Sequence, residues 1–310
     1  HHDTIFPLFL FIAGVSFPYS VAKQRAGGMS EGRIYAKIVR RGLTLVVLGM
    51  VYNGLFKLDF ENLRIASVLG RIGLAWSIAA VLYLNFGVKT RAAIAVAVLA
   101  GYGALSALVA APDAAGAGPL TFEGNLAGYI DRQFLPGKLI YGSFDPEGLL
   151  STVPAVVTAM LGMFTGEFVR RSDIRGGRKT LWMAAAAAAL LAAGLAFSGV
   201  LPVNKKLWSS TFVCVVGAYS LGMFALFYYL IDVRGWRRWT LFFRVVGLNS
   251  ITIYLAQRIV GFGRISDFFL GGIASKCPEA VAAVISSAGY VAVCWLFLYF
   301  LYRKNVFLKV

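Results

Sequence analysis

Long apolar runs recur along this chain and constrain its fold more than any other feature of the sequence. A helix needs about 20 predominantly apolar residues to cross the hydrocarbon core of a bilayer. Suitable runs lie at 4–22, 37–56, 65–86, 91–110, 148–170, 180–200, 209–231, 240–262 and 280–302. Only 14% of the residues are charged, whereas a soluble domain carries about 25%. The sequence therefore predicts an all-α fold, a polytopic transmembrane helical bundle with about nine transmembrane helices.

The formal net charge of +16 would suit a nucleic-acid-binding protein, but the basic residues are distributed differently. They gather in short connections between apolar runs, where Lys and Arg act as orientation signals. We therefore expect a lipid bilayer, and no nucleic acid, among the partners. The three cysteines form no Cys-x-x-Cys motif and no cluster with histidine, so we expect no disulfide framework and no metal site.

The division of Lys and Arg between alternate connections predicts the orientation of the bundle. Of the 30 Lys and Arg residues, 19 lie on the side that holds the C-terminus and three lie within apolar runs. The other eight are Lys57, Arg64, Arg132, Lys138, Lys205, Lys206, Arg264 and Lys276. Since the basic side faces the cytoplasm, we expect a cytoplasmic C-terminus and an outward-facing loop at 111–147. The expected location is a bacterial inner membrane, because no organelle-targeting segment is visible.

Two arginines stand out near the start of the run at 65–86. Arg64 and Arg71 are seven residues apart, a spacing that places them on one face of a helix containing both. A charge within a membrane costs about 2.5–3.5 kcal/mol on insertion scales and usually marks a packed or wet interior. We interpret both arginines as substrate-binding residues of one outward-opening cavity. The structural alternative is snorkelling and interhelical pairing.

A pair of carboxylates precedes the helix expected at 148–170. Asp145 and Glu147 flank a proline at the position where carboxylates also stabilise a helix dipole. We predict acid–base or substrate-anchoring roles for both, with helix capping as the alternative. Ser151, Thr158 and Thr165 follow at seven-residue intervals. They predict either a polar interior face on this helix or packing through small residues.

The short loop at 202–209 places two lysines on the side where the orientation rule makes lysine scarce. We interpret Asn204 and Lys205 as substrate-binding residues. Trp208 is interpreted as a stacking surface in the same site, although tryptophan also belongs to the aromatic belts of membrane interfaces.

In the run at 240–262, Ser250, Tyr254 and Gln257 share a helical face, and Asn249 lies beside them. We include Asn249 and Gln257 among the substrate-binding candidates. Taken alone, such a stripe is more often structural hydrogen bonding between helices.

Five motifs in series resemble the heparan-alpha-glucosaminide N-acetyltransferase family. Residues 3–16 (DTIFPLFLFIAGVS) are similar to its D-x-(V/I)-F-P-x-F-x-F-I-x-G-x-S helix, and 63–71 (LRIASVLGR) to its R-I-x-x-V-L-x-R segment. Residues 145–152 (DPEGLLST) resemble D-P-E-G-x-L-x-T, and 202–209 (PVNKKLWS) resemble P-x-N-K-x-L-W-(S/T). Residues 247–251 (GLNSI) match G-x-N-S-I. Each motif is short, but together they cover most of the chain in the family's order.

The resemblance implies a membrane-embedded acetyltransferase that uses cytoplasmic acetyl-CoA as co-substrate and acetylates a glucosamine-type amino sugar on the far side. It also implies a catalytic histidine shortly upstream of Asp3, with one further helix. His1 and His2 lie too close to Asp3 to be its equivalent. Residues 1–310 are thus expected to form a single transmembrane acyltransferase-like domain missing an upstream helix.

The resemblance also suggests how the candidate residues divide the work. Asp3 would orient the upstream histidine, while Asp145 and Glu147 would hold the sugar amine or assist proton removal. Arg64 and the 202–209 loop would position polar groups of the sugar or of the pantetheine arm.

Two other classes of function suit the same residues. An amino-sugar transporter of the inner membrane would use them to line a translocation path, and a membrane scaffold would use them for packing alone. A homo-oligomer is also compatible with the sequence. The acetyltransferase interpretation depends on one geometric expectation: Asp3, Arg64, Glu147 and Lys205 converge from separate helices on one cavity open away from the cytosol.

Overall fold

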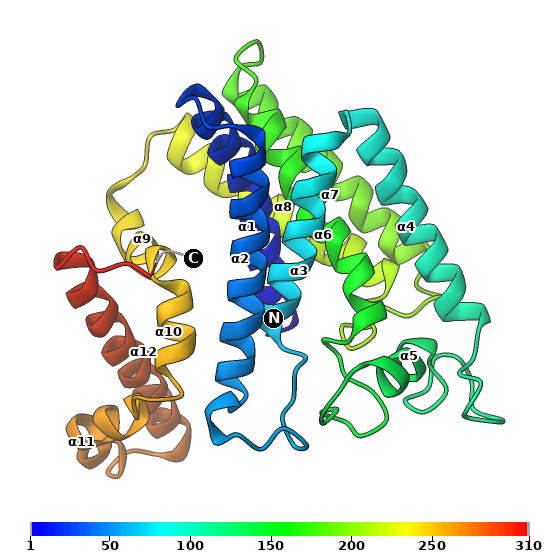
Figure 1. Cartoon of the computed structure of the whole chain (residues 1–310). Coiled ribbons are helices and arrows are strands. Elements are labelled where there is room, and N and C mark those ends of the chain that lie inside the picture. The colour runs from blue at the N-terminus through cyan, green and yellow to red at the C-terminus, as the bar shows by residue number, and fades with distance from the viewer. Residues whose placement is uncertain (1, 309–310) are drawn as a thin grey trace. The chain divides into compact units, whose positions relative to one another are not determined.

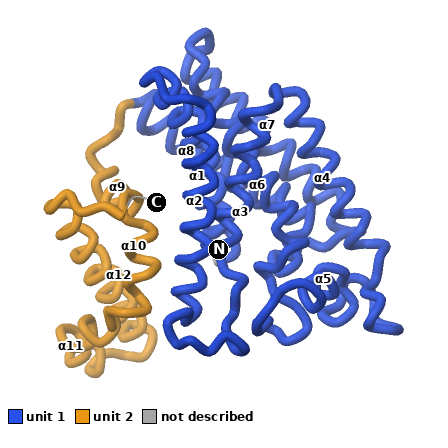
Figure 2. The backbone as a smooth tube through the Cα atoms, viewed as in Figure 1, with its two compact units in different colours: residues 1–234 blue, residues 235–310 orange. Residues whose placement is uncertain are grey.

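The computed structural model describes residues 2–308, which form helices and connecting loops without a β-sheet. The chain divides into two compact units, residues 1–234 and 235–310, shown in different colours in Figure 2. Each unit is described by itself. Whether they act as the single domain expected from the sequence stays a prediction.

The first unit contains most of the helices (Figure 1). Their bounds are α1 His2–Ala26, α2 Glu31–Tyr52, η1 Leu55–Lys57, α3 Val68–Asn85, α4 Val88–Leu108, α5 Leu126–Phe134, α6 Leu149–Arg170, α7 Gly176–Ala196, α8 Ser210–Tyr228 and η2 Tyr229–Val233. The second unit contains η3 Arg238–Thr240, α9 Leu241–Leu248, α10 Ser250–Ala256, α11 Phe262–Ala274 and α12 Glu279–Arg303.

All nine predicted apolar runs form helices, but fewer than nine qualify as membrane spans in the described residues. Seven are long and apolar enough: α1, α3, α4, α6, α7, α8 and α12. The segments Arg238–Leu248 and Ser250–Ala256 make an eighth if they cross together, although the chain bends by 58° between them. Helix α2 is too polar, because Lys37, Arg40 and Arg41 lie within it. The all-α polytopic fold is confirmed, with seven or eight such helices.

Helix α6 lies at the centre of the first unit, in contact with α1, α3, α4, α5 and α8. Its closest partner is α1, and glycines on both helices allow their backbones to meet. A methyl group added at Gly162 would lie 2.0 Å from the carbonyl oxygen of Phe11, and one at Gly14 would lie 2.2 Å from that of Ala159. Small residues permit such close approach between membrane helices, where packing rather than burial from water drives association.

Helices α1, α3, α6 and α8 begin at the same end of this unit, here called the carboxylate end. Asp3 in the first turn of α1 pairs with Lys205, just before α8. Arg64, just before α3, pairs with Asp145, just before α6. Helix α5 and the connections around it lie beyond the ends of α4 and α6 here (Figure 1). Four segments distant in the sequence therefore present their helix beginnings together.

The opposite end of the unit, here called the basic end, contains the C-termini of the same helices. Arg170 at the end of α6 donates to the backbone oxygen of Pro18, late in α1, at 2.8 Å. Arg91 at the start of α4 pairs with Glu167, late in α6, at 2.7 Å. Lys and Arg are favourable near helix C-termini, where carbonyl oxygens lack helical partners.

The second unit departs from the continuous helix predicted at 240–262. Helix α9 ends at Leu248 and α10 begins at Ser250, with Asn249 between them outside helical geometry. The buried Asn249 side chain donates to the backbone oxygen of Val306 at 3.1 Å and accepts from the Thr252 hydroxyl. Through these two hydrogen bonds, Asn249 stabilises the bend between α9 and α10.

Candidate functional site

Arg64 lies in an extended segment before α3, so the expectation that it shares a helical face with Arg71 is wrong. The helix begins only at Val68, because Ser67 caps it by accepting from the backbone N–H of Gly70 at 2.9 Å. The segment before it is held across the loop, where the N–H of Lys138 donates to the backbone oxygen of Leu63 at 3.1 Å. This pairing directs Arg64 toward the residues that precede α6.

Arg64 joins both predicted carboxylates in one cluster. Its Nε donates to Oδ2 of Asp145 at 2.7 Å, and its Nη2 donates to Oδ1 at 2.6 Å. The same Nη2 also contacts the Glu147 carboxylate. Burial alone would lower the pKa of Arg64, but the hydrogen bonds and charges of Asp145 and Glu147 outweigh it and raise the pKa above its usual value. The guanidinium is thus firmly cationic between two carboxylates.

The two carboxylates differ in what remains available to a ligand. Asp145 is fully buried and also accepts from the N–H groups of Ile140 and Glu147. Its oxygens are therefore committed to holding the loop and Arg64. Glu147 keeps 12% of its side chain exposed and lines an adjoining cavity. Of the two, Glu147 is placed to meet a substrate, and Asp145 is placed to orient Arg64.

A third carboxylate, Asp131 in α5, supports this cluster and was missed in the sequence. It is fully buried, and its oxygens accept from the N–H groups of Leu149 at 2.8 Å and Asp145 at 3.3 Å. It therefore caps α6, whose own N-cap residue Gly148 has no side chain to do so. Burial raises the pKa of Asp131 to about 6, against the lowering effect of these backbone hydrogen bonds. In the sequence, Asp131 could have been identified from the short amphipathic helix that follows the capping residue Asn125.

Arg71 lies deeper, within the first turns of α3, and is almost completely buried. Its Nη2 contacts the backbone oxygen of Pro146 and the hydroxyl of Ser151. The guanidinium carbon lies 4.9 Å from the centroid of the Trp208 ring, a cation–π arrangement. Among the described residues, Nε and Nη1 find no hydrogen-bond partner, and an unpaired buried donor costs free energy.

The polar stripe predicted on α6 is confirmed as an interior face. Ser151, Thr158 and Thr165 are all buried. Ser151 contacts Arg71, Thr158 accepts weakly from the Trp208 indole at 3.4 Å, and Thr165 donates to the backbone oxygen of Leu161. The stripe therefore connects α6 to the same buried arginine and tryptophan.

The 202–209 loop forms a hydrogen-bonded turn whose side chains point in different directions. Oδ1 of Asn204 accepts from the N–H groups of Lys206 and Leu207, at 2.8 and 3.3 Å. Asn204 thus holds the turn with its carbonyl group. Lys205 pairs with Asp3 at 3.1 Å, on the exposed side.

Trp208 is buried, and its assignment as a stacking surface for a ligand stays a prediction. Its ring packs against Phe6 of α1 and Phe212 of α8, with centroids 5.0 and 5.2 Å apart. The backbone φ of Trp208 is +50°, which is unusual for a bulky residue. Such local strain persists where the surroundings over-determine it, and here the strain directs the indole into the bundle onto Arg71.

A cavity of about 350 Å³ adjoins the cluster and contains two of the predicted residues, Arg71 and Glu147. Ser67 and Thr152 add hydroxyl groups. The rest of the lining is mostly apolar and comes from α3 and the segment before it, from α6 and the 135–148 connection, and from single residues of α2 and α4. This size is within the range of small-molecule sites, which also combine apolar walls with a few polar groups. Arg64 borders it through Glu147. Asp3 and Lys205 lie at the same end of the unit but do not line it, so the expectation that Asp3, Arg64, Glu147 and Lys205 converge on one cavity is wrong: of the four, only Glu147 lines it.

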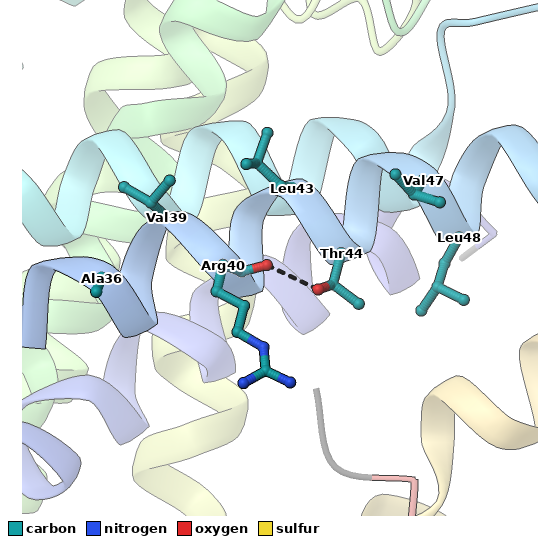
Figure 3. A pocket seen from close by; sticks show the side chains of 7 residues that line it. All are labelled: Ala36, Val39, Arg40, Leu43, Thr44, Val47 and Leu48. Atoms are coloured by element: carbon teal, nitrogen blue, oxygen red, sulfur yellow. Dashed lines mark hydrogen bonds between the residues drawn. The ribbon is translucent and has the colours of Figure 1, made fainter. Parts of the chain in front are cut away.

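A larger hollow, of about 680 Å³, runs along one face of α2 (Figure 3). All seven of its lining residues come from that single helix, and Arg40 is the charged one among them. The Thr44 hydroxyl only donates to the backbone oxygen of Arg40, at 2.7 Å. Because no second element contributes chemistry, this face is not the candidate site.

Two of the predicted substrate-binding residues belong to the second unit and are described there by themselves. Asn249 and Gln257 belong to the second unit, where Asn249 holds the helix bend and Gln257 is exposed after α10. Their assignment to substrate binding stays a prediction. His1, and the side chain of His2, lie outside the described residues.

The fold and the cluster together define the class: a polytopic membrane protein with a buried charged site at one end of its helical bundle. Two curated proteins are similar to the chain over 99% of its length. They are heparan-alpha-glucosaminide N-acetyltransferase of Homo sapiens, at 27% identity, and of Mus musculus, at 26%. The family resemblance seen in the motifs is thus confirmed at moderate identity. No family model matches the chain. The alignments cover 54% of each relative, so the chain spans about half the length of the curated relatives it matches.

Proposed function

We propose that this chain forms the membrane-embedded core of an acetyltransferase that moves an acetyl group from acetyl-CoA to the amine of a glucosamine-type sugar. The acceptor would react at the carboxylate end, on the periplasmic or lumenal side, with acetyl-CoA supplied from the cytoplasm. The observation that carries the proposal is the cluster of Arg64, Asp145 and Glu147, of which Glu147 lines a cavity together with Arg71. The names of the two relatives support the choice of reaction.

An amine acceptor approaches this site as an ammonium ion and must lose a proton before it can attack. A carboxylate that faces the cavity can anchor the ammonium, and Glu147 is the one with exposed surface there. Asp145 acts as a positioning residue, since both of its carboxylate oxygens accept hydrogen bonds from the Arg64 guanidinium and hold it in place. In the same scheme, Asp3 orients an upstream histidine that serves as general base.

The transfer then forms one bond and breaks another. The free amine attacks the carbonyl carbon of the acetyl thioester, the N–C bond forms, and the C–S bond breaks to release the CoA thiol. The proton removed from nitrogen passes through the base to the departing sulfur. Negative charge develops on the carbonyl oxygen during attack, and the buried Arg71, which lines the cavity, could offset it. Asn204 and Lys205 shape the adjoining loop on the acceptor side.

The decisive experiment supplies labelled acetyl-CoA and glucosamine to the full-length protein in liposomes. Label in the sugar amide supports the enzyme. Labelled glucosamine that crosses the membrane unmodified, with no requirement for acetyl-CoA, would instead identify a transporter of amino sugars.

Glu147→Gln tests the site itself. We expect turnover to fall by about 10²-fold or more, because roughly that factor accompanies loss of a positioned acid–base or anchoring group. Glu31→Gln is the matched control, since Glu31 pairs only with Arg25 on the exposed basic end. Wild-type turnover by a folded Glu147→Gln protein would remove this residue from the proposed chemistry.

A further inference from the structure

A crevice of about 400 Å³ lies between α6 and α7, apart from the cavity at the carboxylate end. Helix α7 packs mainly against α8, which leaves this crevice open beside α6. One stripe of each helix forms a wall, and buried residues of two further helices, Phe11 of α1 and Leu221 of α8, form the floor. The walls are Leu161, Phe164, Thr165 and Phe168 from α6, and Trp182, Met183, Ala186 and Leu190 from α7.

The α6–α7 crevice has the chemistry of a site for hydrocarbon. Thr165 supplies a hydroxyl group, but this group already donates to the backbone oxygen of Leu161 at 2.8 Å. Phe11 at the floor is fully buried, whereas Trp182 keeps 63% of its surface exposed and so marks the open side. Both α6 and α7 are long and apolar enough to cross a bilayer. Acyl chains are therefore what the open side of the crevice would meet.

Two arginines continue the α7 wall toward the basic end of the unit. Trp182, Ala186 and Leu190 follow one another at intervals of one helical turn and share a face of α7. Arg178 lies one turn before Trp182 on the same face, about 6 Å away along the helix axis. Arg175, the N-cap residue of α7, precedes it on this face. Both arginines are exposed.

The chain does not neutralise the charges of these two arginines. Within residues 2–308, neither Arg175 nor Arg178 forms an ion pair with a carboxylate. The acidic residue of the same connection, Asp173, pairs with Arg171 at 2.6 Å. Two unpaired cations thus lie at the end of an apolar crevice, in line with one of its walls.

We propose that the α6–α7 crevice, together with Arg175 and Arg178, binds one phospholipid that has an anionic headgroup. An acyl chain occupies the crevice beside Trp182, and the headgroup pairs with the two arginines one turn further along α7. Basic residues beside membrane helices recognise anionic headgroups, and tryptophan is enriched at the level of the headgroups. The site lies on a different pair of helix faces from the carboxylate cluster, and it does not depend on the proposed reaction.

Quenching of tryptophan fluorescence by brominated lipid tests this site in the full-length protein. The protein is reconstituted in phosphatidylcholine vesicles that contain a rising fraction of phosphatidylglycerol or phosphatidylcholine with brominated acyl chains. The part of the quenching that is lost in Trp182→Phe reports on the crevice. We expect brominated phosphatidylglycerol to quench Trp182 at a much lower mole fraction than brominated phosphatidylcholine. Arg178→Gln should reduce this preference about fivefold, and the double variant Arg175→Gln with Arg178→Gln should remove it.

Controls separate the site from a general attraction between a basic protein and an anionic membrane. Arg33→Gln removes another exposed arginine, on α2 and away from the crevice, with the same change in net charge. It should keep the wild-type preference, as should Arg178→Lys. Ala186→Leu fills the crevice and should weaken the quenching of Trp182 by both lipids. An unchanged midpoint of thermal unfolding in the arginine variants shows that their effect comes from the site and not from misfolding.

Several results would overturn the lipid site. Equal quenching of Trp182 by the two brominated lipids would show that the crevice does not select an anionic headgroup. The same conclusion follows if the preference survives in the double arginine variant. Recovery of Trp182 fluorescence on addition of inorganic phosphate, compared with chloride at equal ionic strength, would mean that the arginines bind a soluble phosphate. Absence of quenching by either lipid would show that protein covers the crevice.

Discussion

The carboxylate end and the basic end of the first unit both contain buried or half-buried charges, but they satisfy them by different means. At the basic end, Arg170 and Lys179 donate to the backbone oxygens of Pro18, in the second half of α1, and Val169, in the last turn of α6. At the carboxylate end, Arg64 meets two carboxylates that come from a segment some eighty positions away. The basic end thus combines backbone acceptors with the one-to-one pair of Arg91 and Glu167, whereas the carboxylate end gathers two carboxylates on one arginine.

This difference separates an architectural from a chemical use of charge. Cations near helix C-termini are stabilised wherever a helix ends, so they require no particular partner side chain. A buried ion pair is another matter, because desolvation of both groups offsets much of their attraction. The long-range cluster of Arg64, Asp145 and Glu147 therefore adds little to stability over an apolar core, and its presence points to a function.

Among the variants that test this comparison, Arg64→Met should cause the largest loss of stability. The change leaves the fully buried Asp145 without its cation, and removing one partner of a buried pair costs about 3–5 kcal/mol. Reversible denaturation in mixed micelles measures this as a loss in the free energy of unfolding. A double variant, Arg64→Met with Asp145→Leu, should recover much of the stability but no acetyl transfer. Equal stability of Arg64→Met and wild type would show that water already compensates Asp145.

An intermediate effect is expected from Asp131, through pH. The pKa of about 6 in the folded protein lies above the ordinary value of 3.8, so the folded state binds the proton more tightly than the unfolded chain. The free energy of unfolding contributed by this group therefore falls as pH rises from about 4 to about 6, by up to about 3 kcal/mol. Asp145 faces the group and adds to the shift, whereas Arg71 opposes it.

Asp131→Asn isolates this dependence from that of the other carboxyl groups. The difference in unfolding free energy between wild type and variant should change with pH across this window and level off above it. The amide still accepts from Leu149 but cannot accept from Asp145 with its nitrogen, so the variant also loses one hydrogen bond, at about 1 kcal/mol. A pH-independent difference would contradict the assignment.

How far the sequence could anticipate this arrangement depended on the range of each interaction. Apolar runs located every long helix, because the membrane requirement is local and strong. Motif spacing also selected Asp145, Glu147 and Arg64. It could not place Arg64 outside α3, since that depends on the pairing of Leu63 with Lys138 across the loop. Nor could it bury Trp208, whose orientation follows from a positive φ in the turn held by Asn204.

The residues missed altogether lie in the part of the 111–147 loop that precedes the motif at 145–152, and this part contains neither a long apolar run nor a family motif. Asp131 matters only because α5 lies beside the start of α6. Its role is created by a tertiary contact between segments that local patterns treat separately. Helix α2 shows the reverse case, where length predicted a span but Lys37, Arg40 and Arg41 make it too polar.

The smallest effect is expected from an ion pair at the basic end. Arg25 donates to Glu31 at 2.7 Å, yet about half of each side chain is exposed. Such pairs gain little, because solvent screens the attraction and ordering two long side chains costs entropy. Arg25→Gln should leave the midpoint of thermal unfolding unchanged within error and should not alter acetyl transfer. A clear loss of stability on this change would mean that the basic end depends on side-chain pairing as the carboxylate end does, and the distinction between the two ends would fail.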